Sequence, residues 1–389
     1  MRSKVRQRLS VMLVALVLGL AAYAPLKRAL FAVRLLVSVR SLAAGATAED
    51  LHVSQERVTR HREGRDLESL VYRPAGTQPD RALLLVAGIS EQGCYHPRLM
   101  AVSRSLAAQG FVVVTPDIRM FREFMISPEA LDEIAFWFHQ IKELPGGDRI
   151  QRVGLGGISF SGTLALIAAA RPEIRDRVAY VLAIGPYDDP LVCTRGWFGA
   201  GPITVGDGYY PTRFYAKWII MVTALEMLPD PKEREFIHEV LVALLLQKKV
   251  PDPPPALSDD SRRWFRLAVM RENESDPELT RQIEAYLTPR LYRKITPDRA
   301  GPEIRCPVFL VHGAYDDLIP PDESRRLRSR LTRAKSYLLV SPFLTHTHPL
   351  DKPLGWGEQL KGLADIAGFF YRFAQVVAET EPNGPFCYC

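Results

Sequence analysis

Hydrophobic and polar residues follow two alternating patterns along this chain. Short runs that are apolar throughout suit strands buried on both faces of a parallel sheet. They predict strands at Ala82 to Ala87, Phe111 to Thr115, Val153 to Gly156, Val178 to Ile184, Pro307 to Val311 and Ser336 to Val340. Helical periodicity between and after these runs predicts helices at Pro97 to Gln109, Pro128 to Leu144 and Trp356 to Ala378. The alternation predicts an α/β fold with a doubly wound, mostly parallel sheet.

Two segments interrupt this alternation. Leu51 to His61 and Leu67 to Tyr72 are separated by a polar turn and predict a pair of antiparallel edge strands. Between residues 189 and 305 the apolar runs give way to helical patterns without strands, at Arg213 to Leu228, Pro231 to Lys248, Ser261 to Glu274 and Pro277 to Leu287. We interpret this region as a helical cap inserted into the sheet domain. Its many aromatic residues either form the cap's own core or face the sheet.

The N-terminal segment has a different character. Leu9 to Leu26 is a run of 18 uncharged, mostly apolar residues behind the basic sequence MRSKVRQR, close to the ~20 residues that a helix needs to cross a bilayer. We favour an uncleaved membrane anchor, either transmembrane or a signal anchor. The alternative is a cleaved signal peptide with a site at Ala22 to Ala24, which Pro25 would follow directly. Basic residues on both sides leave the membrane orientation open.

The charge of the chain is concentrated at this end. The 389 residues carry a net charge of +6, yet residues 1–48 hold eight Lys and Arg and no Asp or Glu, so the remainder has 42 basic and 44 acidic residues. A nucleic-acid partner is therefore not expected. The five cysteines, Cys94, Cys193, Cys306, Cys387 and Cys389, form no C-x-x-C pair and no disulfide framework. No metal and no organic cofactor is implied.

These observations divide the chain into five parts. Residues 1–48 form the anchor and its basic flanks, 49–188 the first part of the α/β core, 189–305 the helical cap, 306–380 the second part of the core and 381–389 a tail.

A serine stands at the centre of the core. Gly157, Ile158, Ser159, Phe160 and Ser161 follow the strand at Val153 and precede an apolar helix, as in the nucleophile-elbow pattern G-x-S-x-G, with Ser in place of the second glycine. A phosphate-binding loop is the alternative, but the Lys of a P-loop and the G-x-G-x-x-G spacing are absent. A plain structural turn is the other alternative. Ser159 would lie at the carboxyl edge of the sheet, where ligands bind.

A serine nucleophile needs an imidazole to accept its proton and a carboxylate to orient that imidazole. The chain offers an acid after the strand at Pro307 and histidines after the last strand. With GISFSG at Gly157 to Gly162, HGAYDDLIP at His312 to Pro320 and the late THTHP loop, it resembles an α/β-hydrolase fold enzyme with an inserted cap, over roughly residues 67–378.

The resemblance implies a catalytic triad. The Asp of the family pattern H-G-x-x-D-x-x-[IV]-P corresponds to Asp316, which is the expected acid. Asp317, Asp188 and Asp189 are the alternatives. His346 is the expected base and His348 the alternative, because Pro349 restricts the backbone of His348. The family usually has Gly-His here, whereas this chain has Thr-His. We expect structural roles for His312 and ordinary surface or helix roles for His96 and His139.

The resemblance also implies an oxyanion hole made by the backbone N–H groups of Ile89 and Phe160. We therefore predict a serine hydrolase that cleaves carboxylic esters of small-molecule, lipophilic acyl substrates at a membrane. A thioesterase, amidase or C–C hydrolase would use the same triad, and a non-catalytic, membrane-tethered binding protein is the alternative of another class. Haloalkane and epoxide hydrolases need an Asp where this chain has Ser159. The side of the membrane and the oligomeric state stay open.

Overall fold

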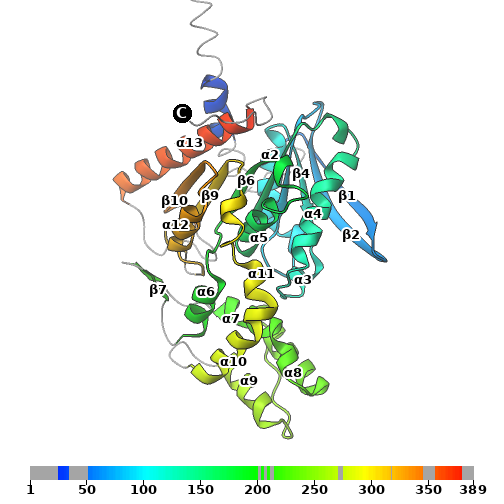
Figure 1. Ribbon diagram of the computed structural model, residues 1–389, viewed down its shortest axis with the longest axis vertical. Helices are drawn as coiled ribbons and strands as arrows, with labels where there is room; N and C mark the ends of the chain where they lie inside the picture. Colours follow the sequence, from blue (N-terminus) through cyan, green and yellow to red (C-terminus); the bar gives the residue numbers. More distant parts are fainter. Residues whose placement is uncertain are drawn as a thin grey trace, which may run out of the picture.

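The computed structural model describes residues 25–34, 51–199, 203–205, 208–210, 214–269, 275–316, 318–344 and 355–378. Its centre is an eight-stranded sheet with the strand order β1-β2-β4-β3-β5-β6-β9-β10 (Figure 1). The strands are β1 (Val53–Arg62), β2 (Arg65–Pro74), β3 (Arg81–Val86), β4 (Phe111–Pro116), β5 (Arg152–Ile158), β6 (Val178–Ile184), β9 (Val308–Gly313) and β10 (Ser336–Ser341). β2 is antiparallel to β1 and β4, and the remaining pairs are parallel, which confirms the predicted sheet.

Helices cover both faces of the sheet. Side chains alternate along β3, so Leu83 and Leu85 join one hydrophobic cluster while Leu84 and Val86 join the other. The first cluster is closed by α2 (Pro97–Ala108) and α13 (Trp356–Ala378). The second is closed by α4 (Ala130–Gln140), α5 (Phe160–Ala169) and α12 (Pro321–Arg330). This doubly wound arrangement explains why the parallel strands are apolar on both faces.

The helical region between β6 and β9 contains α6 (Pro190–Phe198), α7 (Phe214–Thr223), α8 (Pro231–Leu245), α9 (Asp259–Val269) and α10 (Pro277–Leu287), followed by a π-helical turn at Thr288–Tyr292. The prediction that it holds no strands was wrong. β7 (Ile203–Val205) and β8 (Gly208–Tyr210) form an antiparallel pair in which Val205 faces Gly208. Gly206 and Asp207 separate them in the sequence, which is a signal for a two-residue hairpin.

A further helix is formed by residues 25–34, near α13. Its Phe31 ring lies 6.2 Å from the ring of Phe111 and 6.3 Å from that of Phe373, and Ala32 is buried, so this helix is part of the packed body. In the part of the chain that the structure describes, no helix has both the length and the apolar character to cross a membrane. The predicted anchor, Leu9 to Leu26, lies outside the described residues except for its last two, and stays a prediction.

Helix α7 of the cap is fastened to the end of α9 by two side chains. The Nζ atom of Lys217 donates to the carbonyl oxygen of Leu267 at 3.0 Å, and Nε1 of Trp218 donates to that of Ala268 at 2.9 Å. The Lys217 side chain is buried, with its Nζ 4.2 Å from the centre of the Phe214 ring. Burial disfavours the ammonium form and lowers the pKa of Lys217 to about 8.

This pKa predicts a pH dependence of stability. Because the folded chain binds the Lys217 proton less tightly than the unfolded chain, the free energy of unfolding should rise with pH above about 8. We expect Lys217→Met to be more stable than wild type near neutral pH, and the difference to shrink as the pH rises. Urea denaturation over this range measures it, with the exposed Lys232→Met as control. A difference that does not change with pH would contradict the expectation.

Candidate active site

Ser159 occupies a strained turn between β5 and α5. Its backbone has φ 59° and ψ −131°. Residues other than glycine rarely adopt a positive φ, and this conformation costs about 1–3 kcal/mol. Hydrogen bonds hold the turn: the Ser159 N–H donates to the carbonyl of Ile184 on β6 at 2.6 Å, and the Ser159 carbonyl accepts from Gly162 N–H at 2.8 Å. The serine is therefore fixed at the carboxyl end of a central strand.

The residues beside Ser159 must be small because the backbone turns back on itself. A Cβ atom on Gly157 would lie 2.1 Å from the carbonyl oxygen of Ser161. Ser161, which replaces the second glycine of the family pattern, is fully buried. Its hydroxyl donates to the carbonyl oxygen of Ala87 and lies 3.0 Å from that of Ile158. The replacement thus adds a hydrogen bond between the elbow and the end of β3.

The loop after β3 runs against the elbow. A Cβ atom on Gly88 would lie 3.3 Å from the carbonyl oxygen of Ile158 and 3.5 Å from Cβ of Ser159. The Tyr215 hydroxyl of cap helix α7 donates to the Ile89 carbonyl at 3.0 Å, and burial raises the pKa of Tyr215 to about 12, so the hydroxyl stays protonated. Phe160 is the first residue of α5, so its N–H has no acceptor within the helix. Phe160 thus follows Ser159 directly, and the loop that carries Ile89 packs against the elbow.

Asp316 follows β9 and is buried, with 2% of its surface exposed. Its Oδ1 accepts hydrogen bonds from the backbone N–H groups of Leu318 at 3.0 Å and Ile319 at 2.9 Å. These bonds stabilise an ionised carboxylate and fix its plane. The structure therefore places Asp316 at the same edge of the sheet as Ser159, where both line one cavity.

His312 has the structural role that the sequence suggested. Its Nε2 lies 2.8 Å from the carbonyl oxygen of Ile319 and its Nδ1 lies 2.6 Å from Oγ of Ser324. Because a carbonyl oxygen can only accept, Nε2 carries a proton. The same Nε2 is 3.4 Å from Oδ2 of Asp316, so His312 also supports the acid loop.

Two of the alternative acids have other partners. Asp188 is buried and forms a bidentate ion pair with Arg330, in which Nη2 of Arg330 lies 2.9 Å from Oδ2 of Asp188. Asp189 caps α6, with its Oδ1 2.8 Å from Leu191 N and 3.4 Å from Val192 N. The third alternative, Asp317, lies outside the described residues. Asp188 and Asp189 therefore stabilise the loop after β6 through an ion pair and a helix cap.

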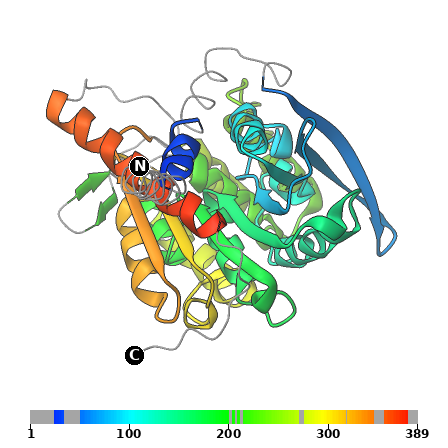
Figure 2. The ribbon, with the colours of Figure 1, turned by 90° about the horizontal axis from the view of Figure 1, so that it is seen from above.

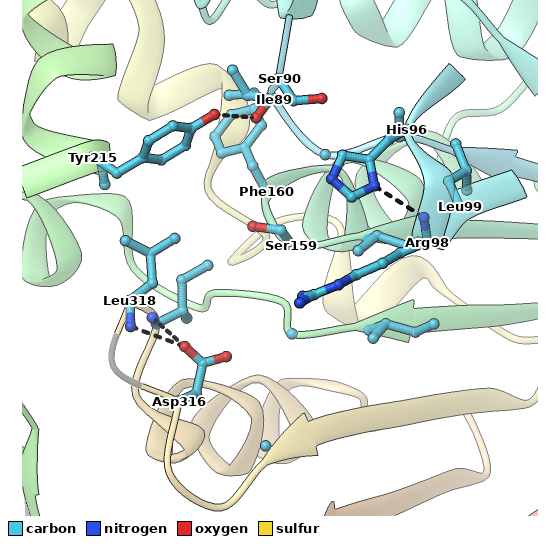
Figure 3. A pocket seen from close by; sticks show the side chains of 18 of the residues that line it. Ile89, Ser90, His96, Arg98, Leu99, Ser159, Phe160, Tyr215, Asp316 and Leu318 are labelled. Atoms are coloured by element: carbon cyan, nitrogen blue, oxygen red, sulfur yellow. Dashed lines mark hydrogen bonds between the residues drawn. The ribbon is translucent and has the colours of Figure 1, made fainter. Parts of the chain in front are cut away.

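Both candidate bases, His346 and His348, lie outside the described residues, in the segment between β10 and α13. The choice between them stays a prediction. The structure brings together the other four predicted residues, since Ser159, Phe160, Ile89 and Asp316 all line one cavity (Figure 3).

This cavity has a volume of about 990 Å³ and is mostly apolar. Cap residues Trp197, Trp218 and Ile219 line it on one side, and Ile366 and Phe370 of α13 contribute from another. Aromatic residues of the cap therefore face the core as well as forming the interior of the cap. Nε1 of Trp197 donates to the carbonyl oxygen of Leu318 at 2.7 Å, which joins the cap to the Asp316 loop.

Sequence reasoning missed two residues of this cavity. His96 was expected to be an ordinary surface or helix residue, but it caps α2, where its Nδ1 accepts from the Arg98 N–H at 3.2 Å, and it lines the cavity. Burial, and then the charge of Arg98, lower the pKa of His96. The Arg98 side chain extends toward Ser159 (Figure 3). Their position just after β3, at the carboxyl edge of the sheet, is the signal that could have identified them.

Comparison with solved structures finds proteins of this general shape. One is the acylaminoacyl peptidase of Pyrococcus horikoshii, 12% identical with a TM-score of 0.48, where the match covers 87% of this chain and 43% of that one. Another is an esterase of Pyrobaculum calidifontis, 18% identical with a TM-score of 0.44, covering 90% and 91%. A third is Est1E of Butyrivibrio proteoclasticus, 16% identical with a TM-score of 0.45, covering 83% and 99%. No protein-family model and no curated protein matches the sequence.

The chain's own geometry identifies its fold. The eight-stranded order with β2 antiparallel, the left-handed serine between β5 and α5 and the buried acid after β9 are the features of the α/β-hydrolase fold. The fold that the resemblance implied is thereby confirmed.

The close packing at Gly157 predicts a specific sensitivity. Because an added methyl group would overlap the Ser161 carbonyl, Gly157→Ala should lower the free energy of unfolding by about 1–3 kcal/mol. Gly368→Ala is the matched control: its methyl would meet no atom within 4 Å, and removing a helical glycine should raise stability by about 0.5–1 kcal/mol. Urea denaturation measures both. Equal stability of the two variants would contradict the described turn.

Proposed function

We propose that this protein is a serine hydrolase that cleaves carboxylic esters with a lipophilic acyl group. The observation that carries the proposal is Ser159, held at φ 59° by the turn between β5 and α5 and lining a large apolar cavity together with the buried Asp316. A serine in this conformation projects its hydroxyl away from the sheet, toward a bound substrate.

The reaction proceeds through an acyl-enzyme. Oγ of Ser159 attacks the carbonyl carbon of the ester while His346 accepts the hydroxyl proton, and Asp316 orients the imidazole and stabilises its charge. The backbone N–H groups of Ile89 and Phe160 bind the oxyanion of the tetrahedral intermediate. The imidazolium then protonates the leaving alkoxide as the C–O bond breaks. Water, deprotonated by the same imidazole, then attacks the acyl carbon. The bond from this carbon to Oγ breaks, the imidazolium returns the proton to Oγ of Ser159, and the carboxylic acid leaves.

The cavity supports a lipophilic substrate. Its volume of about 990 Å³ is at the upper end of the range for small-molecule sites, and aliphatic and aromatic side chains form most of its wall. The described polar side chains that line it, aromatic residues aside, are Ser90, His96, Arg98, Ser159, Gln247 and Asp316. A long acyl chain would bury its surface here with few unsatisfied polar groups.

We also propose that Leu9 to Leu26 anchors the protein in a membrane. The support is the sequence itself, an uncharged apolar segment preceded and followed by basic residues. An enzyme anchored in this way would meet substrates that partition into lipid.

Labelling with a fluorophosphonate tests the nucleophile. The reagent forms a covalent bond with an activated serine, so we expect wild type to be labelled and Ser159→Ala to lose labelling completely. Ser329→Ala, on the surface of α12, should be labelled like wild type. Labelling of Ser159→Ala to the wild-type extent would show that the nucleophile is elsewhere.

Turnover of p-nitrophenyl esters of short and long acyl chains tests the rest of the triad. His346→Gln should lower kcat by a factor on the order of 10⁴ or more, and Asp316→Asn by a factor on the order of 10⁴, because both changes disable proton transfer from the serine. His348→Gln should retain most of the activity. The reverse ranking of the two histidines would make His348 the base, and a folded wild-type protein without turnover would favour the non-catalytic alternative.

A further inference from the structure

Large apolar side chains are exposed on two helices at one end of the molecule. The helix of residues 25–34 exposes Leu26 (59%), Leu30 (43%) and Val33 (54%), and α13 exposes Trp356 (83%), Leu360 (66%) and Leu363 (52%). On each helix the three residues are spaced i, i+4, i+7, which places them along one face. We call these six residues the apolar end face.

The six residues form two stripes: Phe31 packs on Phe373 in the later part of α13, whereas Trp356, Leu360 and Leu363 lie on its first turns. Of the eleven exposed large hydrophobic side chains in the described part of the chain, six belong to the apolar end face, Phe343 lies against Gly362 of α13, and the other four lie on the cap and in loops. Single exposed apolar residues are ordinary on a protein surface, but three large ones along one face of a helix mark a candidate interaction site.

The two helices are firmly packed on their other sides. Phe31 contacts Phe111 and Phe373 with ring centres 6.2 and 6.3 Å apart, and Ile366, Phe369 and Phe373 of α13 are buried. Figures 1 and 2 show the two helices side by side, at the end of the molecule opposite α8, α9 and α10. Both helices are therefore attached to the body of the protein, although Gly362 is the one buried residue among residues 356–365, which carry the exposed stripe of α13.

Charge and sequence indicate what covers this surface. Lys27 and Arg34 are exposed beside the apolar stripe of the first helix, and residues 1–48 contain no acidic residue, as suits the headgroups of an anionic lipid surface. On α13, Glu358, Lys361 and Asp365 are spaced along a different face from Trp356, Leu360 and Leu363. Basic flanks beside an uncharged apolar stripe are typical of a helix lying in the membrane interface.

The chain before residue 25 points to the same occupant. Leu9 to Leu26 is uncharged and close to the length needed to cross a bilayer, and its last residue, Leu26, lies in the helix that carries Leu30 and Val33. We propose that the apolar end face lies in the interfacial region of a lipid bilayer, with Trp356 at the depth of the headgroups, where tryptophan is enriched.

This placement relates the bilayer to the cavity. α13 carries the exposed Leu360 and Leu363 and, one to two turns further along, Ile366 and Phe370, which line the cavity. An acyl chain leaving the bilayer at this helix would remain close to apolar surface. The proposal goes beyond the ester hydrolase function and does not depend on it.

The five tryptophans allow a site-specific test. Trp137, Trp197 and Trp264 are buried and Trp218 is half-buried, so Trp356 is the one exposed tryptophan among the five. The full chain is reconstituted into vesicles of phosphatidylcholine and phosphatidylglycerol, with or without bromine on the acyl chains. Because bromine quenches tryptophan on contact, wild type should lose emission in brominated vesicles, and Trp356→Phe should lose far less.

A second pair of variants keeps the reporter in place. Leu360→Asn combined with Leu363→Asn should reduce the quenching of Trp356. Val192→Asn, which changes an exposed apolar residue on cap helix α6, should leave it as in wild type. Because fluorescence requires no turnover, the result is independent of the proposed enzymatic function.

Three outcomes would overturn the proposal. Equal quenching of wild type and Trp356→Phe in vesicle-bound protein would mean that the anchor holds the protein while the end face does not contact lipid. If Trp356 is equally emissive with and without bromine, and becomes less accessible as the protein concentration rises, a second copy of the chain covers the apolar end face. If the full chain does not sediment with the vesicles, neither the anchor nor the apolar end face binds the membrane.

Discussion

The left-handed backbone at Ser159 is the constraint on which the rest of the site depends. A conformation that costs about 1–3 kcal/mol persists only where the surroundings determine it. Here the Ile184 carbonyl of β6 accepts a hydrogen bond from the Ser159 N–H, and Gly157 leaves no room for a side chain. The buried Ser161 hydroxyl connects the turn to Ala87, the first residue after β3. The order of β3, β5 and β6 in the sheet thus sets the position of a single hydroxyl group.

The cap also determines the geometry of the site, because it donates hydrogen bonds to the two loops beside Ser159. Tyr215 of α7 donates to Ile89 in the loop after β3, and Trp197 of α6 donates to Leu318, whose own N–H holds Asp316. A displacement of these cap helices would therefore move the loop after β3 and the Asp316 loop together. The hydrogen bonds of Lys217 and Trp218 with the end of α9 connect the cap helices to one another.

Much of the fold followed from local sequence patterns, since strands buried on both faces must be apolar throughout. The bounds of β6, α10 and α13 agree with the prediction to the residue, and the Ser159 elbow and Asp316 lie where the motifs placed them. The parts that were missed depend on tertiary contacts. The hairpin of β7 and β8 is too short for a periodic signal, and His96 and Arg98 join the site only because α2 starts beside Ser159.

The most direct test of the account is a crystal structure of the protein after reaction with a phosphonate. We expect phosphorus bonded to Oγ of Ser159, the phosphonyl oxygen within hydrogen-bond distance of the N–H groups of Ile89 and Phe160, and a ring nitrogen of His346 between Ser159 and Asp316. A phosphonate attached to another residue, or a Ser159 adduct with no imidazole near Asp316, would contradict it.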